Sequence, residues 1–285
     1  MDKELKMNKK TLYVSDMDGT LMGSDSRVSP TTRDILNGLI DENDILFTVA
    51  TARTPATVVP LMSEVKTTMP YIVLAGAAMW DSVKGEFVDV QSIPHDTVRA
   101  IAAIFEKHGL HPFIYRQHGN VIHAHHYGEM SVQEQEFVQE RLNTPFKRFL
   151  LDDAQYHTND DPAMLIFSMN DYATLERIYN EVKATVDCSP MFYHDIFDPG
   201  VGLLEIYTSG CTKAGAIKRL AQRVGATRVV AFGDNRNDIA MLQAADHAVA
   251  VDNAFPEVKA VAHEVIGPNT TDAVAHFIAK DITLK

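Results

Sequence analysis

A short apolar strand that leads directly into two carboxylates constrains this chain more than any other stretch. Residues Thr11–Val14 form the apolar run, and Asp16 and Asp18 follow it one residue apart, just ahead of Gly19. Carboxylates crowded at a strand end are desolvated and repel each other, so the arrangement is tolerated where a cation or a developing charge needs it. Mg²⁺ prefers one or two carboxylates together with phosphate oxygens and water. The stretch alone is compatible with phosphoryl chemistry and equally with a solvated turn after a strand, and the rest of the chain favours phosphoryl chemistry.

The totals of the chain limit its size class and its partners. The 285 residues suffice for two domains, and 46% apolar with 22% charged residues allows a substantial core. The formal net charge of −12 argues against a nucleic acid or an anionic membrane as a partner. No apolar run reaches membrane-spanning length, and no signal peptide opens the chain. We therefore expect a cytoplasmic protein, monomeric or weakly homodimeric, that binds a small molecule.

The pattern of apolar runs predicts a doubly wound α/β core with a parallel sheet. Runs at Ile45–Ala50 and Tyr71–Ala75 follow the first strand, with helical segments between them, as in strands buried on both faces. The same rhythm resumes at Leu203–Tyr207 and continues with a strand at Arg228–Phe232. We expect residues 1–83 and 203–285 to form this core.

In residues 84–202 the alternation of buried strands and helices stops, and the pattern predicts an inserted α+β domain. Helical segments at Asp96–Lys107 and Tyr172–Thr185 enclose hairpin-like strands on either side of Gly119-Asn120, which is a turn signal. A segment of this length is too long for a loop inside a compact domain.

Candidate site residues follow several strands of the predicted core. Ligands of open α/β sheets bind beyond the carboxyl ends of the strands, so these residues meet at one edge. Asp16 is a candidate nucleophile, and Asp18 is a candidate acid and base. Thr51 offers a hydroxyl after the second strand, Lys213 a positive charge at a helix start, and Asp234 a further metal carboxylate.

The order of four motifs resembles the haloacid dehalogenase superfamily. The motifs are Asp-x-Asp-Gly-Thr, Thr-x-Arg, a lone Lys and Gly-Asp-x-x-Asn-Asp, and the large insert resembles the Cof-type members, subclass IIB. The resemblance implies a Rossmann-like core with a C2-type cap domain that selects the substrate. It also implies a Mg²⁺-dependent phosphatase that hydrolyses small phosphate monoesters, often sugar phosphates, through an aspartyl-phosphate.

The same resemblance implies a role for each matching residue. Asp16 is the nucleophile, and Asp18 is the acid and base. Metal binding falls to Asp16, to Asp234 and to the backbone carbonyl of Asp18. Phosphate or substrate binding is implied for Met17, Thr51, Ala52, Lys213 and Asn237, and supporting roles for Arg53 and Asp238.

Two departures from the family pattern bear on the site. Ala52 stands where the family usually has glycine, which would weaken phosphate binding if the backbone there needs a positive φ. Ala75 stands where relatives typically have asparagine, which removes an amide side chain near the site. Neither departure removes a catalytic group, so we expect an active enzyme.

Three alternatives remain open on the sequence alone. A phosphomutase or phosphotransferase would use the same aspartyl-phosphate but pass the phosphoryl group to a hydroxyl instead of water. A non-catalytic sensor of phosphorylated metabolites would bind the same ligands, although loss of Asp16 or Asp18 would be its expected mark. Arg53 could equally pair with a core carboxylate and merely hold its loop.

Overall fold

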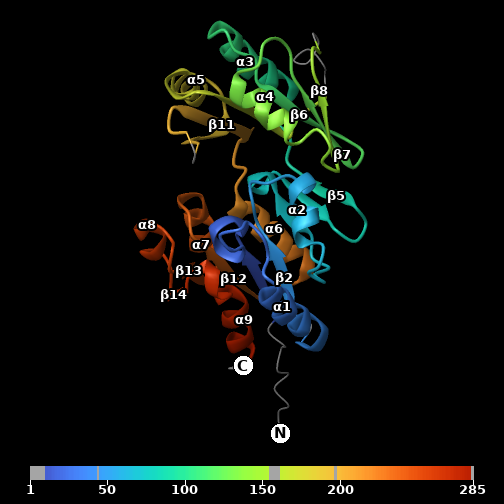
Figure 1. Cartoon of the computed structure of the whole chain (residues 1–285), viewed down its shortest axis with the longest axis vertical. Helices are drawn as coiled ribbons and strands as arrows, with labels where there is room; N and C mark the ends of the chain where they lie inside the picture. Colours follow the sequence, from blue (N-terminus) through green and yellow to red (C-terminus); the bar gives the residue numbers. More distant parts are fainter. Residues whose placement is uncertain (1–9, 44, 154–160, 196–197, 284–285) are drawn as a thin grey trace. The chain divides into compact units, whose positions relative to one another are not determined.

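The computed structural model describes residues 10–43, 45–153, 161–195 and 198–283, which fall into two units (Figure 1). Unit 1 holds the described residues of Met1–Arg53, Val58–Lys84 and Thr212–Lys285, and unit 2 those of Thr54–Thr57 and Gly85–Cys211. Across the described ranges, no helix combines the length and the apolar character needed to cross a membrane.

Unit 1 is built on a parallel sheet with the strand order β14-β13-β12-β1-β2. Its strands are β1 (Thr11–Ser15), β2 (Leu46–Val49), β12 (Arg228–Gly233), β13 (His247–Val251) and β14 (Glu264–Ile266). Every residue of β1 and β2 is buried, as parallel strands covered on both faces require. The chain winds outward from β1 in one direction and from β12 in the other, so the topological switch point lies between these two strands.

Helices connect the strands of this sheet. They are α1 (Pro30–Asn43), α2 (Pro55–Met62), α6 (Lys213–Val224), α7 (Ile239–Ala244), α8 (Pro256–Lys259) and α9 (Ala273–Thr283). Helix α1 packs beside α9, and α6 packs beside α7 (Figure 1). Side-chain caps fix where helices begin, since Ser29 Oγ accepts a hydrogen bond from the Thr32 amide at 3.0 Å and Thr212 Oγ1 accepts one from Gly215 at 3.0 Å.

The predicted third strand is shorter than its apolar run. Strand β3 spans Tyr71–Val73, joins the parallel sheet through a bridge between Ala50 and Ile72, and pairs antiparallel with β4 (Ala78–Asp81). Strand β5 (Glu86–Val90) follows in the chain and belongs to unit 2. The chain leaves β3 through a turn, η2 (Leu74–Gly76), in which three consecutive residues have positive φ angles of 52°, 51° and 101°. The turn residues are as apolar as the strand, so composition alone did not show where the strand ends.

Unit 2 contains an antiparallel-rich sheet in the order β10-β11-β9-β6-β7-β8. The strands are β6 (Phe113–His118), β7 (Val121–His125), β8 (Lys147–Leu150), β9 (Leu165–Asp171), β10 (Cys188–His194) and β11 (Val201–Thr208), and the helices are α3 (His95–Lys107), α4 (Val132–Gln139) and α5 (Tyr172–Thr185). The hairpin β6–β7 and the helices α3 and α5 lie where the sequence predicted them.

Strand β11 corrects one expectation, because the parallel sheet does not resume at Leu203. This strand pairs with β9 and β10 inside unit 2, where Leu204 and Ile206 join the apolar core that α3 and α5 complete. Unit 1 resumes at Thr212, one residue before α6. An apolar run predicts a strand. It does not indicate which sheet the strand joins, because the neighbouring strands are distant in sequence.

Candidate functional site

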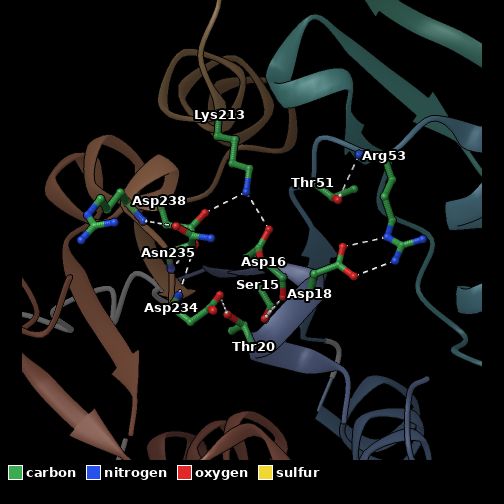
Figure 2. Close-up of polar contacts among 11 residues, drawn as sticks. Ser15, Asp16, Asp18, Thr20, Thr51, Arg53, Lys213, Asp234, Asn235 and Asp238 are labelled. Carbon is green, nitrogen blue, oxygen red and sulfur yellow. Dashed lines mark hydrogen bonds and ion pairs between the residues drawn. The ribbon is translucent and has the colours of Figure 1, made fainter. Parts of the chain in front are cut away.

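Lys213 joins two of the predicted carboxylates at the switch point of the sheet. Asp16 follows β1, and Lys213 is the first residue of α6. The Lys213 Nζ atom donates to Asp16 Oδ1 at 2.6 Å and to Asp238 Oδ1 at 2.7 Å (Figure 2). All three side chains are buried, so both ion pairs are largely shielded from solvent. The tertiary structure thus brings the first, third and fourth motifs into direct contact.

Asp238 organises the loop that follows β12. Its Oδ2 atom accepts hydrogen bonds from the backbone amides of Asp234 at 3.2 Å and Asn235 at 3.1 Å. Its other carboxylate oxygen binds Lys213, so protein donors engage both oxygens of this fully buried residue. Asp238 thus contacts both the Lys213 ammonium and the backbone that carries Asp234.

Asp234 lies against the loop of the first motif. The hydroxyl of Thr20, which is buried, donates to Asp234 Oδ1 at 2.8 Å (Figure 2). Gly19 has a φ of 76°, and a Cβ atom there would lie 2.4 Å from Asp234 Oδ2. A glycine is therefore required both by conformation and by space. Sequence reasoning assigned no role to Thr20, although its place in Asp-x-Asp-Gly-Thr was the available signal.

Asp18 is the one carboxylate of the first motif that points away from Lys213. It accepts two hydrogen bonds from Arg53, from Nε to Oδ2 at 2.7 Å and from Nη2 to Oδ1 at 2.6 Å (Figure 2). The pair is half-exposed. Arg53 therefore does not pair with a buried core carboxylate, as the alternative interpretation of this residue supposed. Arg53 instead holds the candidate acid and base.

The loop after β2 is tied to the turn after β3. The amide of Ala75 donates to the Thr51 carbonyl at 3.0 Å, and the amide of Leu74 donates to the Arg53 carbonyl at 3.0 Å. Thr51 is buried, and its hydroxyl accepts from the Arg53 amide at 3.2 Å. Ala52 has no positive φ. Replacement of the usual glycine by Ala52 therefore introduces no backbone strain in this protein.

The remaining predicted phosphate contacts differ in exposure. The Met17 side chain is fully buried, which leaves its backbone as the part available to a ligand. Asn237 is exposed on the short turn η3 (Arg236–Asp238) that follows the loop of Asp234.

Burial and mutual repulsion dominate the electrostatics of the carboxylates. Burial raises the pKa of Asp234 to about 6, and the Thr20 hydroxyl opposes this shift. Burial also raises the pKa of Asp16, the Lys213 ammonium opposes the shift, and the charge of Asp238 adds to it. The pKa of Lys213 is raised, because its two carboxylate partners outweigh the lowering effect of its burial. Three carboxylates thus lie near a single ammonium group. Their excess of negative charge would attract a further positive charge.

These carboxylates fit the ligand set of a divalent cation. Within the described ranges, Asp16, Asp234 and Asp238 each offer a ligand oxygen, and these atoms lie within 4.8 Å of one another. Carboxylate oxygens are what Mg²⁺ binds, and it retains waters or substrate oxygens at its other positions. The Asp18 carboxylate is not in this group, and a metal contact through its backbone carbonyl stays a prediction.

Comparison with known proteins gives four consistent findings. The model of the haloacid dehalogenase-like hydrolase family matches residues 13–278. The 5-amino-6-(5-phospho-D-ribitylamino)uracil phosphatase YitU of Bacillus subtilis (strain 168) is 25% identical, over 97% of this chain and 99% of that protein. The pyridoxal phosphate phosphatase YbhA of Escherichia coli (strain K12) is 27% identical, over 92% of this chain and 95% of that protein. A solved haloacid dehalogenase-like hydrolase from Bacteroides thetaiotaomicron superposes with a TM-score of 0.77 at 23% identity, over 96% of this chain and 100% of that one, which confirms the predicted fold class.

Proposed function

Because this chain belongs to the haloacid dehalogenase-like hydrolases, as a Cof-type phosphatase, we propose that it hydrolyses small phosphate monoesters through an aspartyl-phosphate on Asp16, with Mg²⁺ as cofactor. Family membership confirms the predicted class of enzyme, a phosphatase acting on small phosphate esters. We propose, beyond this class of enzyme, the catalytic steps of the hydrolysis, the metal and the individual substrates.

The observation that carries the proposal is the contact of Lys213 with Asp16 at the end of β1. The Asp16 carboxylate, held by Nζ at 2.6 Å, would attack the phosphorus while the ester oxygen leaves with a proton from Asp18. Asp18 would then take a proton from the water that attacks the phosphoryl-aspartate. Lys213 would hold the negative charge of the phosphoryl oxygens, and Thr51 would add a hydroxyl contact. Mg²⁺, held by Asp16 and Asp234, would neutralise the remaining charge.

The proposed substrate class follows from the relatives and from the site. The two relatives named above act on phosphate esters of a ribitylaminouracil and of pyridoxal. We propose that this enzyme likewise takes small phosphorylated metabolites, sugar phosphates among them. The inserted domain, which corresponds to most of unit 2, would select among them.

Phosphate release from a panel of phosphate esters tests the proposal. The panel contains hexose and pentose phosphates, pyridoxal phosphate, flavin mononucleotide and nucleotides, each with Mg²⁺ and with excess chelator. We expect release that needs Mg²⁺ and is abolished in Asp16→Asn, while Asp25→Asn, at an exposed acid outside the site, keeps wild-type rates. Rapid quenching followed by borohydride reduction should convert a phosphorylated Asp16 to homoserine, which mass spectrometry locates.

Three results would contradict the proposal in different ways. Activity that survives Asp16→Asn would exclude the nucleophile. Transfer of the phosphoryl group to a second sugar without release of phosphate would indicate a mutase or transferase. A folded protein that binds these esters without turning any of them over would favour a sensor.

A further inference from the structure

We propose that Asn253 is a positioning residue that holds the loop of the first motif against the loop of Asp234. The loop of the first motif is η1 (Met17–Leu21), a single wide turn closed by a hydrogen bond from the Met22 amide to the Met17 carbonyl at 3.0 Å. Asp18 and Gly19 inside it have non-helical backbone angles. Such a turn has no repeating hydrogen-bond ladder of its own, so its shape depends on outside contacts.

Two asparagine side chains supply those contacts. Asn253 Nδ2 donates to the Gly19 carbonyl at 2.7 Å, and Asn269 Nδ2 donates to the Met22 carbonyl at 2.7 Å. The backbone amide of Asn269 donates to Asn253 Oδ1 at 2.9 Å, which links the Asn253 side chain to the backbone of the second asparagine. The carboxamide of Asn253 is therefore used at both ends, as a donor to a carbonyl and as an acceptor from an amide.

The segment that carries Asn253 also holds the second loop. Two residues further on, the Phe255 amide donates to the Asp234 carbonyl at 3.0 Å. One short segment after β13 thus contacts the backbone on both sides of the carboxylate group. Because Gly19 packs directly against the Asp234 carboxylate, a shift of Gly19 displaces Asp234 or breaks its bond to Thr20. Asn253 thereby fixes the spacing of the two loops.

The chemistry of the contact requires asparagine. Aspartate has the same shape and accepts from Asn269, but without an N–H it cannot donate to the Gly19 carbonyl, and its charge would face that oxygen. Alanine removes both bonds. Asn253 is exposed, so its replacement should lower the melting temperature far less than a core substitution does. A loss of function without a loss of stability would therefore single out positioning.

The test compares Asn253→Ala and Asn253→Asp with the control variant Asp252→Ala. In the wild type the exposed side chain of Asp252, the preceding residue, pairs with Lys259 at 3.1 Å. Thermal melts across a Mg²⁺ titration, without substrate, report the metal response of each variant. We expect the Mg²⁺ concentration that gives half of the stabilisation to rise about 10-fold or more in both Asn253 variants. We expect kcat to fall roughly 10- to 100-fold, because small misplacements at a reacting centre are costly, with KM changed far less. Asp252→Ala should match the wild type in both assays.

The inference rests on the proposed function for its kinetic arm alone. If the wild type releases no phosphate, the proposed function fails, and the Mg²⁺ melts still decide the role of Asn253. Wild-type Mg²⁺ response in Asn253→Ala would overturn the inference. So would a fall in its Mg²⁺-free melting temperature as large as the one in a core variant such as Leu36→Ala, because the residue would then act on the fold as a whole.

Discussion

The Asp18 carboxylate accepts bidentate hydrogen bonds from the Arg53 guanidinium, at 2.7 Å and 2.6 Å. The loop that follows β2 therefore orients the candidate acid and base. The contact joins the first and second motifs. A planar guanidinium sets the direction of a carboxylate in a way that a single ammonium does not.

Replacement of Arg53 by lysine should therefore lower activity while preserving charge. We expect kcat/KM for the best phosphate ester to fall about 10-fold in Arg53→Lys, because a lysine cannot hold both oxygens of Asp18 at once. The stability cost should stay below about 1 kcal/mol, since the pair is half-exposed. Phosphate release and urea unfolding measure the two effects. Arg33→Lys, at a similarly half-exposed arginine that pairs with Asp34 and Glu64, is the matched control, and full activity in Arg53→Lys would contradict the orienting role.

Gly76 should be intolerant of a side chain because it touches the start of the Lys213 helix. Its φ is 101°, and a Cβ atom would lie 2.3 Å from the Thr212 carbonyl oxygen and 2.9 Å from the Lys213 amide. Gly85 also has a positive φ, of 69°, but has open space around it. We expect Gly76→Ala to lower the free energy of unfolding by at least about 2 kcal/mol more than Gly85→Ala. Urea unfolding of the two variants isolates the contact from the backbone strain, and equal costs would refute it.

The response to Mg²⁺ should depend on pH because metal and protons compete for the same carboxylates. Burial raises the pKa of Asp234 from 3.8 to about 6. Between these values the folded protein keeps a proton that the unfolded chain has released, so this group makes the free energy of unfolding fall as pH rises. Mg²⁺ binds the ionised form, so the rise in Tm that it produces should be larger near about pH 7.5 than near about pH 5.

Differential scanning fluorimetry with Mg²⁺ and with chelator measures this response. In Asp234→Asn the Mg²⁺ effect should be lost at both pH values, whereas Asp25→Asn should behave as the wild type. A Mg²⁺ effect of equal size in acid and at neutral pH would show that these carboxylates are not the ligands.

Lys147 in unit 2 should destabilise the protein near neutral pH. Its Nζ atom lies 4.6 Å from the ring centre of Tyr115 and 5.1 Å from those of Phe137 and Phe149, and no carboxylate of the described residues pairs with it. Burial lowers its pKa from 10.5 to about 7. Between these values the unfolded chain binds the proton that the folded protein lacks, so this group makes the free energy of unfolding rise with pH.

Lys147→Met should therefore stabilise the protein near neutral pH, on the order of 1 to 3 kcal/mol, because it removes the cost of burying an amine that is charged in the unfolded chain. The gain should shrink as the pH rises toward and above 10.5, because only there is the amine neutral in both states. Urea unfolding at several pH values, with the exposed Lys66→Met as the control, measures the difference. A gain that does not change with pH would point to packing instead of charge.

Local sequence patterns were enough to predict much of the site and of the core. The strands before Asp16 and before Asp234 could be predicted because apolar runs and turn residues act over a few neighbours. The sheet rule then placed Asp16 and Asp234 at one edge, since parallel strands end together. The same local logic failed at Leu203–Tyr207 and after Val73, where the apolar run was clear but its partner strand and its end were not.

The sequence by itself determined which chemical groups this protein has, the motif order that reveals its family, and the edge of the sheet where those groups meet. The tertiary structure alone decided that Lys213 lies between Asp16 and Asp238, that Arg53 holds Asp18, and that Asn253 reaches the Gly19 carbonyl. These contacts join residues up to 234 positions apart, and the direction of a side chain depends on packing and on the competing partners around it. No periodicity along the chain encodes that direction, because it is set by residues that become neighbours only when the chain folds.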